Sequence, residues 1–186
     1  MEKNRSHTLN CQGRLLDLTA PVVMGILNVT PDSFFGGSRI GDTDALLRQA
    51  EKMLSEGAAL LDIGGASSRP GAEEVSEDEE KRRVLPALEA VTTRFPDAIL
   101  SVDTWRAAVA QAAIETGAAL VNDISAGAWD TAMYATVAAC GCPYILLHAQ
   151  GTPRTMQLAP TYSDVVQEVL DFFVHEVGKL RALGVR

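Results

Sequence analysis

Five short apolar segments of this sequence each lead into side chains that could bind a small polar molecule. The polar residues that follow them are Asn28, Thr30 and Asp32, then Asp62, Ser68 and Arg69, then Asp103, then Asn122, and last His148. Aspartate accepts hydrogen bonds and asparagine both donates and accepts them, so Asp103 with Asn122 would suit a planar heterocycle that carries N–H groups. Ser68 and Arg69, in a segment rich in Gly and Ser, could hold an anion such as phosphate.

Asn28 offers an oxygen ligand of the kind that suits Mg²⁺, a cation that usually accompanies pyrophosphate. Structural interpretations compete with these chemical ones. Asp62 lies within an apolar segment, where a structural hydrogen bond is as good an explanation as a ligand contact. Thr104 and Asp123 could simply cap the helices that follow them. A histidine such as His148, at the end of an apolar strand, is more often a packed residue than a catalyst.

The segments that position these residues alternate between strand and helix patterns. Continuous apolar runs, typical of strands buried on both faces, are expected at 22–27, 58–63, 99–102, 118–122 and 144–148. Helical patterns follow them, including helices over about 76–91, 105–116, 130–139 and 164–183. The second of the helices in the chain opens with a capping-box pair, Ser76 and Glu79. Gly57, Gly117 and Gly141 stand where a left-handed residue would end a helix.

Strict alternation of strand and helix implies a parallel sheet with right-handed crossovers. Two architectures fit: the first five units of a (β/α)8 barrel, or a complete five-stranded doubly wound sheet. In both, the carboxyl ends of the strands meet at one edge, so the polar residues are expected to converge there. Residues 1–20 are expected to form an N-terminal extension with a possible short β-hairpin, and 21–186 the α/β domain.

The composition of the chain limits the kinds of binding partner that are expected. The net charge of -8 and the pI of about 4.8 argue against nucleic acid and against an anionic membrane surface. No apolar run approaches the roughly 20 residues that span a bilayer, and the N-terminus lacks the apolar core of a signal peptide. The odd set of Cys11, Cys140 and Cys142 fits a reducing compartment. A cytoplasmic protein is therefore expected.

Two long motifs resemble the signatures of the dihydropteroate synthases. They are Met24-Gly25-Ile26-Leu27-Asn28-Val29-Thr30-Pro31-Asp32-Ser33-Phe34, and Asp62-Ile63-Gly64-Gly65 continued by Ser68-Arg69-Pro70-Gly71-Ala72. Shorter motifs follow in family order at 101–104, 121–124 and 148–151. The chain departs from the family at Phe35, at Ala66 where a glutamate is common, and at Ala149 where a methionine is usual. The resemblance implies a TIM barrel, with about the first five βα units present in 21–186.

The same resemblance implies the reaction and the roles of residues. The family condenses 6-hydroxymethyl-7,8-dihydropterin diphosphate with para-aminobenzoate, releasing pyrophosphate, and it is the target of sulfonamides. Carried over by motif, the catalytic residues would be Asp103, Asn122 and Arg69, with Asn28 as the ligand of Mg²⁺. The substrate contacts would be Asp103, Asn122, Ser68, Arg69, Pro70, Thr30, Asp32, Phe34 and His148. The full-length enzyme would be a homodimer.

Two alternatives stay open from the sequence. A pterin-binding module that serves a corrinoid methyltransferase would use the same aspartate and asparagine, although it does not call for the two long loops. The other is a non-catalytic truncated fragment, since the family's later strands supply a further aspartate, a lysine and an arginine. Gly184-Val185 repeats the junction that precedes three of the strands, at Gly57, Gly117 and Gly141. These 186 residues alone are therefore expected to be inactive.

Overall fold

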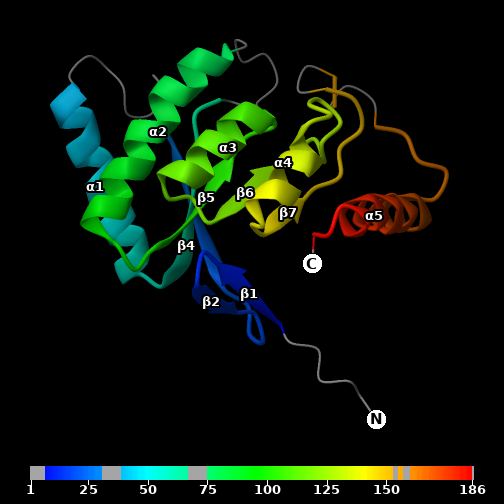
Figure 1. The fold of residues 1–186 in the computed structure, drawn as a ribbon, viewed down its shortest axis with the longest axis horizontal. Coiled ribbons are helices and arrows are strands. Elements are labelled where there is room, and N and C mark those ends of the chain that lie inside the picture. Colours follow the sequence, from blue (N-terminus) through cyan, green and yellow to red (C-terminus); the bar gives the residue numbers. More distant parts are fainter. Residues whose placement is uncertain (1–6, 31–38, 67–74, 153–154, 157–159, 186) are drawn as a thin grey trace.

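A parallel five-stranded sheet with helices along one side makes up most of the chain (Figure 1). The computed structural model describes residues 7–30, 39–66, 75–152, 155–156 and 160–185. The strands of this sheet are β3 (Val23–Asn28), β4 (Ala58–Gly64), β5 (Ile99–Asp103), β6 (Leu120–Asp123) and β7 (Tyr144–Leu146). The helices are α1 (Arg39–Ser55), α2 (Glu77–Arg94), α3 (Ala107–Thr116), α4 (Met133–Cys140) and α5 (Val165–Ala182).

The order of the strands decides between the two predicted architectures. The sheet runs β3-β4-β5-β6-β7, and every neighbouring pair is parallel. A doubly wound sheet reverses its strand order at a switch point, whereas a (β/α)8 barrel adds each strand beside the one before it. The observed order has no reversal. The chain therefore forms the first five units of a barrel, and the doubly wound alternative is wrong.

The two faces of each strand have different neighbours, because successive side chains point to opposite sides. Leu61, Ile63, Leu100, Val102 and Val121 point toward the helices and are buried with them in one apolar core. The helices contribute Leu46, Ala50, Val84, Leu88, Ala110, Ala113, Met133 and Val137 to that core. The opposite face carries the polar residues that the sequence singled out.

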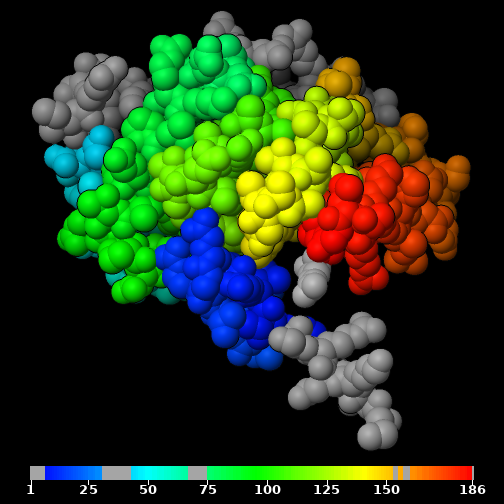
Figure 2. All heavy atoms as spheres, viewed as in Figure 1, coloured from blue at the N-terminus to red at the C-terminus, as the bar shows by residue number. Residues whose placement is uncertain are grey.

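A short antiparallel hairpin closes the other end of this second face. It consists of β1 (Thr8–Cys11) and β2 (Arg14–Asp17), and it lies at the foot of the molecule in Figure 2. Cys11 and Leu16 are buried against Leu60, Ile99 and Leu120, which form an apolar floor. Arg14 donates to the carbonyls of Pro96 (2.8 Å) and Ala98 (2.7 Å), so the hairpin is tied to the connection that leads into β5.

Two helices begin later than the sequence predicts, and hydrogen bonding explains both starts. The Oδ2 atom of Asp130 accepts from the backbone N–H of Ala107 at 2.7 Å, and its Oδ1 atom accepts from Ala132 at 3.0 Å. Asp130 therefore lies in a loop that caps α3, instead of opening α4. The predicted capping residue Ser76 is confirmed, since its hydroxyl accepts from the N–H of Glu79 at 3.3 Å.

Strand β7 ends at Leu146, two residues before the predicted end at His148. Helix α5 follows β7 in the chain, and the carboxylate of Glu176 joins it to helix α4. The Tyr134 hydroxyl of α4 donates to Glu176 of α5 at 2.8 Å, and Lys179 donates to the same carboxylate at 2.8 Å.

Within the described part of the chain, no helix combines the length and the apolar character needed to cross a membrane.

Candidate active site

One row of residues crosses four strands at the same height on the face turned away from the helices. Asn28 pairs in register with Gly64, Gly64 with Asp103, and Asp103 with Asn122. Register partners in parallel strands point to the same side, so the side chains of Asn28, Asp103 and Asn122 share one face. Gly64 has no side chain, and a Cβ atom there would lie 3.3 Å from the Oδ2 atom of Asp103. The row therefore carries two amides and a carboxylate, and the absence of a side chain at Gly64 leaves room for Asp103.

A second row lies one step deeper and supports the first. Asp62 pairs in register with Ser101, and both are buried. The Nδ2 atom of Asn122 donates to the Oδ2 atom of Asp62 at 2.8 Å. The amide oxygen of Asn122 is buried, and it has no hydrogen-bond partner among the described residues. A buried acceptor of this kind is normally satisfied, so it points to a bound donor such as a ligand N–H group or a water molecule.

The carboxylates of this region shift one another's proton affinity. Burial, together with the charges of Asp62, Glu80 and Asp123, raises the pKa of Asp103 to about 7. Burial also raises the pKa of Asp62, although the hydrogen bond from Asn122 opposes the shift. Near neutral pH, Asp103 can thus exist with or without its proton. A ligand with N–H groups or a positive ring would favour its charged form.

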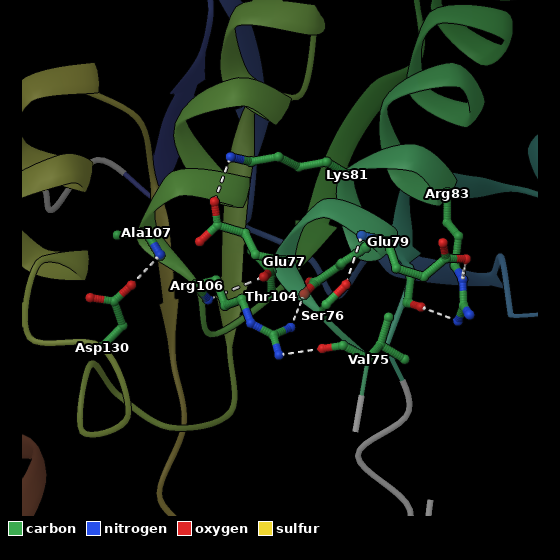
Figure 3. A network of polar contacts seen from close by, with 12 residues as sticks. Val75, Ser76, Glu77, Glu79, Lys81, Arg83, Thr104, Arg106, Ala107 and Asp130 are labelled. Carbon is green, nitrogen blue, oxygen red and sulfur yellow. Dashed lines mark hydrogen bonds and ion pairs between the residues drawn. The ribbon is translucent and has the colours of Figure 1, made fainter. Parts of the chain in front are cut away.

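Two residues near this row were not predicted from the sequence. Glu80, in the first turn of α2, is fully buried and forms an ion pair with Arg106. Arg106 follows β5, and Figure 3 shows its guanidinium group directed toward the carbonyl of Val75. A signal was available for Glu80, because it falls on the apolar stripe of α2 with Val84, Ala87, Leu88 and Val91. A charge inside such a stripe is buried with its partner or not at all. Arg106 carries no comparable local signal.

The remaining candidate residues differ in their exposure and in their contacts. Asn28 is exposed at the end of β3, and Thr30 is half-buried just beyond it. His148 packs its ring on Phe172 of α5, with centroids 4.7 Å apart, and on Tyr162, at 5.9 Å. The packed interpretation of His148 thus agrees with its surroundings. Asp32, Phe34, Ser68, Arg69 and Pro70 lie outside the described residues.

Contrary to the capping interpretation, Thr104 and Asp123 do not cap the helices that follow them but hold the loops that follow their own strands. The Thr104 hydroxyl accepts from the N–H of Arg106 at 3.1 Å. Asp123 accepts from the N–H groups of Ser125 (2.7 Å) and Gly127 (2.9 Å), and from the Tyr144 hydroxyl at 2.7 Å. With its oxygens thus occupied, Asp123 acts on the site through its charge. Trp105 and Trp129 pack edge to face with ring centroids 5.5 Å apart.

The oxygen donors present are compatible with a magnesium ion at Asn28, although they do not form a complete coordination shell. The amide oxygen of an exposed asparagine is a hard ligand, and Mg²⁺ commonly keeps several waters and takes few protein ligands. Among the described residues, no group of three or more His, Cys, Asp or Glu side chains gathers to hold a metal.

Comparison with known proteins shows which family this chain belongs to. A model of the family described as "Pterin binding enzyme" matches residues 24–186. The chain is 45% identical to the dihydropteroate synthase of Haemophilus influenzae over 178 residues, which is 96% of this chain and 64% of that enzyme. The chain thus spans less than two thirds of the length of this relative.

Solved structures agree with the fold. A dihydropteroate synthase of Yersinia pestis, in a sulfonamide drug complex, superposes with a TM-score of 0.87 at 46% identity, over 96% of this chain and 64% of that one. The enzyme of Xanthomonas albilineans with 4-aminobenzoic acid gives 0.87 at 40% identity, over 97% and 63%. The same enzyme with 7,8-dihydropteroate gives 0.81 at 37% identity, over 96% and 62%.

Proposed function

Because this chain belongs to the pterin-binding enzyme family, we propose that it binds a dihydropterin through Asp103 and Asn122 and serves in a dihydropteroate synthase. The observation that carries the proposal is the row of acceptors on the polar face of the sheet. Asp103 and the unpartnered oxygen of Asn122 lie on adjacent strands at the same height. A reduced pterin presents ring N–H and amino groups, which such acceptors would satisfy.

The reaction we propose joins 6-hydroxymethyl-7,8-dihydropterin diphosphate to para-aminobenzoate, yielding 7,8-dihydropteroate and pyrophosphate. The amine of para-aminobenzoate replaces the diphosphate at the methylene carbon of the pterin. Positive charge grows on the ring as the diphosphate leaves, and the Asp103 carboxylate would stabilise that charge. Asn122 would orient the ring by accepting from its N–H groups. No covalent intermediate with the protein is required.

The diphosphate and the arylamine would be handled by the residues around this row. Asn28 would hold Mg²⁺, whose charge stabilises the departing diphosphate when the ion is bound. Ser68 and Arg69 would contact the anionic substrates. The further substrate contacts proposed by motif are Thr30, Asp32, Phe34, Pro70 and His148. The similar structures with 4-aminobenzoic acid and with 7,8-dihydropteroate support the arylamine and the product.

Several wider expectations stay proposals. We place the protein in the cytoplasm, which agrees with three free cysteines, and we expect the complete enzyme to be a homodimer. The division into an extension at 1–20 and a barrel domain at 21–186 is likewise proposed. The expectation that 186 residues alone are inactive can be tested by assaying dihydropteroate formation. The methyltransferase alternative shares the pterin site, but the relatives described above are dihydropteroate synthases.

Calorimetric titration with 6-hydroxymethyl-7,8-dihydropterin diphosphate tests the proposal. We expect saturable binding by the unmodified protein and loss of at least about 10-fold in affinity in Asp103→Ala, because a charged hydrogen-bond acceptor is removed. Asp97→Ala is the matched control, since Asp97 is exposed and lies just before the same strand. Absence of binding, or equal binding by Asp103→Ala, would refute the assignment.

A further inference from the structure

The segment that joins β4 to α2 is held at both of its ends by an arginine side chain. At the first end, the Nη1 atom of Arg83 donates to the backbone oxygen of Gly65 at 3.1 Å. At the second end, the Nη2 atom of Arg106 donates to the backbone oxygen of Val75 at 2.5 Å. Figure 3 shows the two arginines on either side of Val75. Two arginines from different parts of the chain thus bond the backbone at the two ends of one connection.

A glutamate in the first turn of α2 holds each of these arginines. The Nε atom of Arg83 donates to the Oε1 atom of Glu79 at 2.8 Å, and only 15% of the Arg83 side chain is exposed. Arg106 forms an ion pair with Glu80, which is fully buried. A guanidinium group carries five N–H donors in a rigid plane, so one arginine can bind a carboxylate and a carbonyl together. Both ends of the segment are therefore tied to neighbouring residues of one helix.

Close packing adds to these bonds at each end. A Cβ atom on Gly65 would lie 2.6 Å from the Cγ2 atom of Val84 and 3.2 Å from the backbone oxygen of Glu80, so the first end lies directly against α2. At the second end, Val75 immediately precedes Ser76, the N-cap residue of the same helix. Both ends of the segment thus have a defined place relative to α2.

We propose that Arg83 and Arg106 are positioning residues, which hold this segment so that Ser68 and Arg69 meet the diphosphate of the pterin substrate. The inference rests on the substrate contacts proposed above for Ser68 and Arg69. Each positioning arginine acts through a backbone oxygen at one end of the segment, and it needs no contact of its own with the substrate. Holding both ends reduces the conformational freedom that binding must remove from the residues between them.

Two pterins separate this positioning role from a general loss of structure. 6-Hydroxymethyl-7,8-dihydropterin diphosphate carries the anionic group, whereas 6-hydroxymethyl-7,8-dihydropterin lacks it and would depend on Asp103 and Asn122. We expect calorimetry of Arg83→Gln to show a loss of about 5-fold or more in affinity for the diphosphate, the size expected when two side chains must be ordered on binding. Affinity for the pterin without diphosphate should be unchanged.

The second end is tested by removing a whole ion pair. Arg106→Gln alone would leave Glu80 buried without a partner, which is strongly destabilising. Glu80→Leu combined with Arg106→Leu replaces the pair with apolar side chains, a change that buried ion pairs commonly tolerate. We expect this double variant to fold and to show the same selective loss of affinity for the diphosphate.

Arg82→Gln is the matched control, because it removes the same charge at the residue next to Arg83. The Arg82 side chain is 72% exposed, and it donates to Glu79 and to the backbone oxygen of Asp78, both at the start of α2. This variant should bind both pterins like the unmodified protein. An equal loss in Arg82→Gln and Arg83→Gln would mean that only the positive charge matters, and the inference would be wrong.

The remaining outcomes separate the inference from the proposed function. Equal losses for the two pterins, or no loss, would show that the arginines only support the fold, which would overturn the inference. Failure of the unmodified protein to bind either pterin would refute the proposed function instead. Hydrogen exchange without ligand then judges the arginines: exchange at 65–66 should be faster in Arg83→Gln than in Arg82→Gln, because a bond that holds this end is lost. Unchanged exchange there would contradict the positioning role.

Discussion

Asn122 donates its side-chain N–H to Asp62 at 2.8 Å, across 60 positions of sequence and from a strand that is not adjacent to that of Asp62. The two strands are separated by β5, so the bond runs beneath Asp103. A negative acceptor on one side fixes the orientation of the amide, because an amide turned the other way would set its oxygen against a carboxylate. Asn122 therefore presents its oxygen, and not its nitrogen, to a ligand.

Replacing Asp62 by Asn should weaken pterin binding without removing any group that we propose to touch the pterin. The new amide can donate as well as accept, so Asn122 loses its reason to hold one orientation. We expect calorimetry to show a loss of affinity of about 10-fold, which corresponds to one hydrogen bond to a charged group. Asp97→Asn, an exposed change of the same type, should bind like the unmodified protein. Equal affinity in the two variants would mean that Asn122 is oriented by something else.

Asp103 should make the stability of the protein depend on pH. Its pKa is raised to about 7 in the folded state from an ordinary value of 3.8, so the folded state binds the proton more tightly than the unfolded state. The stability that this proton contributes is fully present below about pH 4 and is lost as the pH rises through about 7. Over that interval, the loss for this group is at most about 4 kcal/mol.

Urea denaturation of the unmodified protein and of Asp103→Asn, compared between pH 4 and pH 8, measures this effect. The asparagine variant cannot ionise, so its stability relative to the unmodified protein should rise with pH. A constant difference between the two proteins would contradict the raised pKa of Asp103.

Two glycine substitutions should shift stability in opposite directions. A Cβ atom at Gly65 would lie 2.6 Å from Cγ2 of Val84, so Gly65→Ala must displace α2 and should cost about 1–3 kcal/mol. Gly178 lies within α5, with nothing within 4 Å of the added atom, and Gly178→Ala should gain about 0.5–1 kcal/mol from helix propensity. Chemical denaturation measures both. A neutral Gly65→Ala would show that β4 and α2 are less closely packed than described.

Asp130→Ala should loosen a helix that lies far from it in the sequence. Asp130 caps α3 through Ala107, 23 residues earlier, and its loss should cost about 1–2 kcal/mol. Hydrogen exchange should show reduced protection in the first turn of α3. Asp164→Ala removes a cap that acts on its own helix α5, through Val166 and Gln167, and serves as the control. Protection of α3 should be unchanged in that variant.

Much of the architecture followed from local patterns. Strands buried on both faces must be continuously apolar, and glycines follow the helices before three of them, so all five strands and their parallel arrangement were predicted to within about two residues at their ends. The meeting of Asp103 and Asn122 was also predictable, because the carboxyl ends of adjacent parallel strands lie together. Resemblance of the two long motifs was needed to choose the barrel beforehand, since alternation alone fits both architectures.

Tertiary structure alone decided which polar groups act on one another. The bond between Asn122 and Asp62 depends on the register of three strands, and the buried Glu80 of α2 finds its partner, Arg106, 26 residues later in the connection after β5. Asp130 belongs to a different helix cap from the one that its neighbours suggest. Local patterns report whether a side chain is buried, because burial is repeated along each element. Partners that are distant in the chain are set by register and loop geometry, which no local pattern contains.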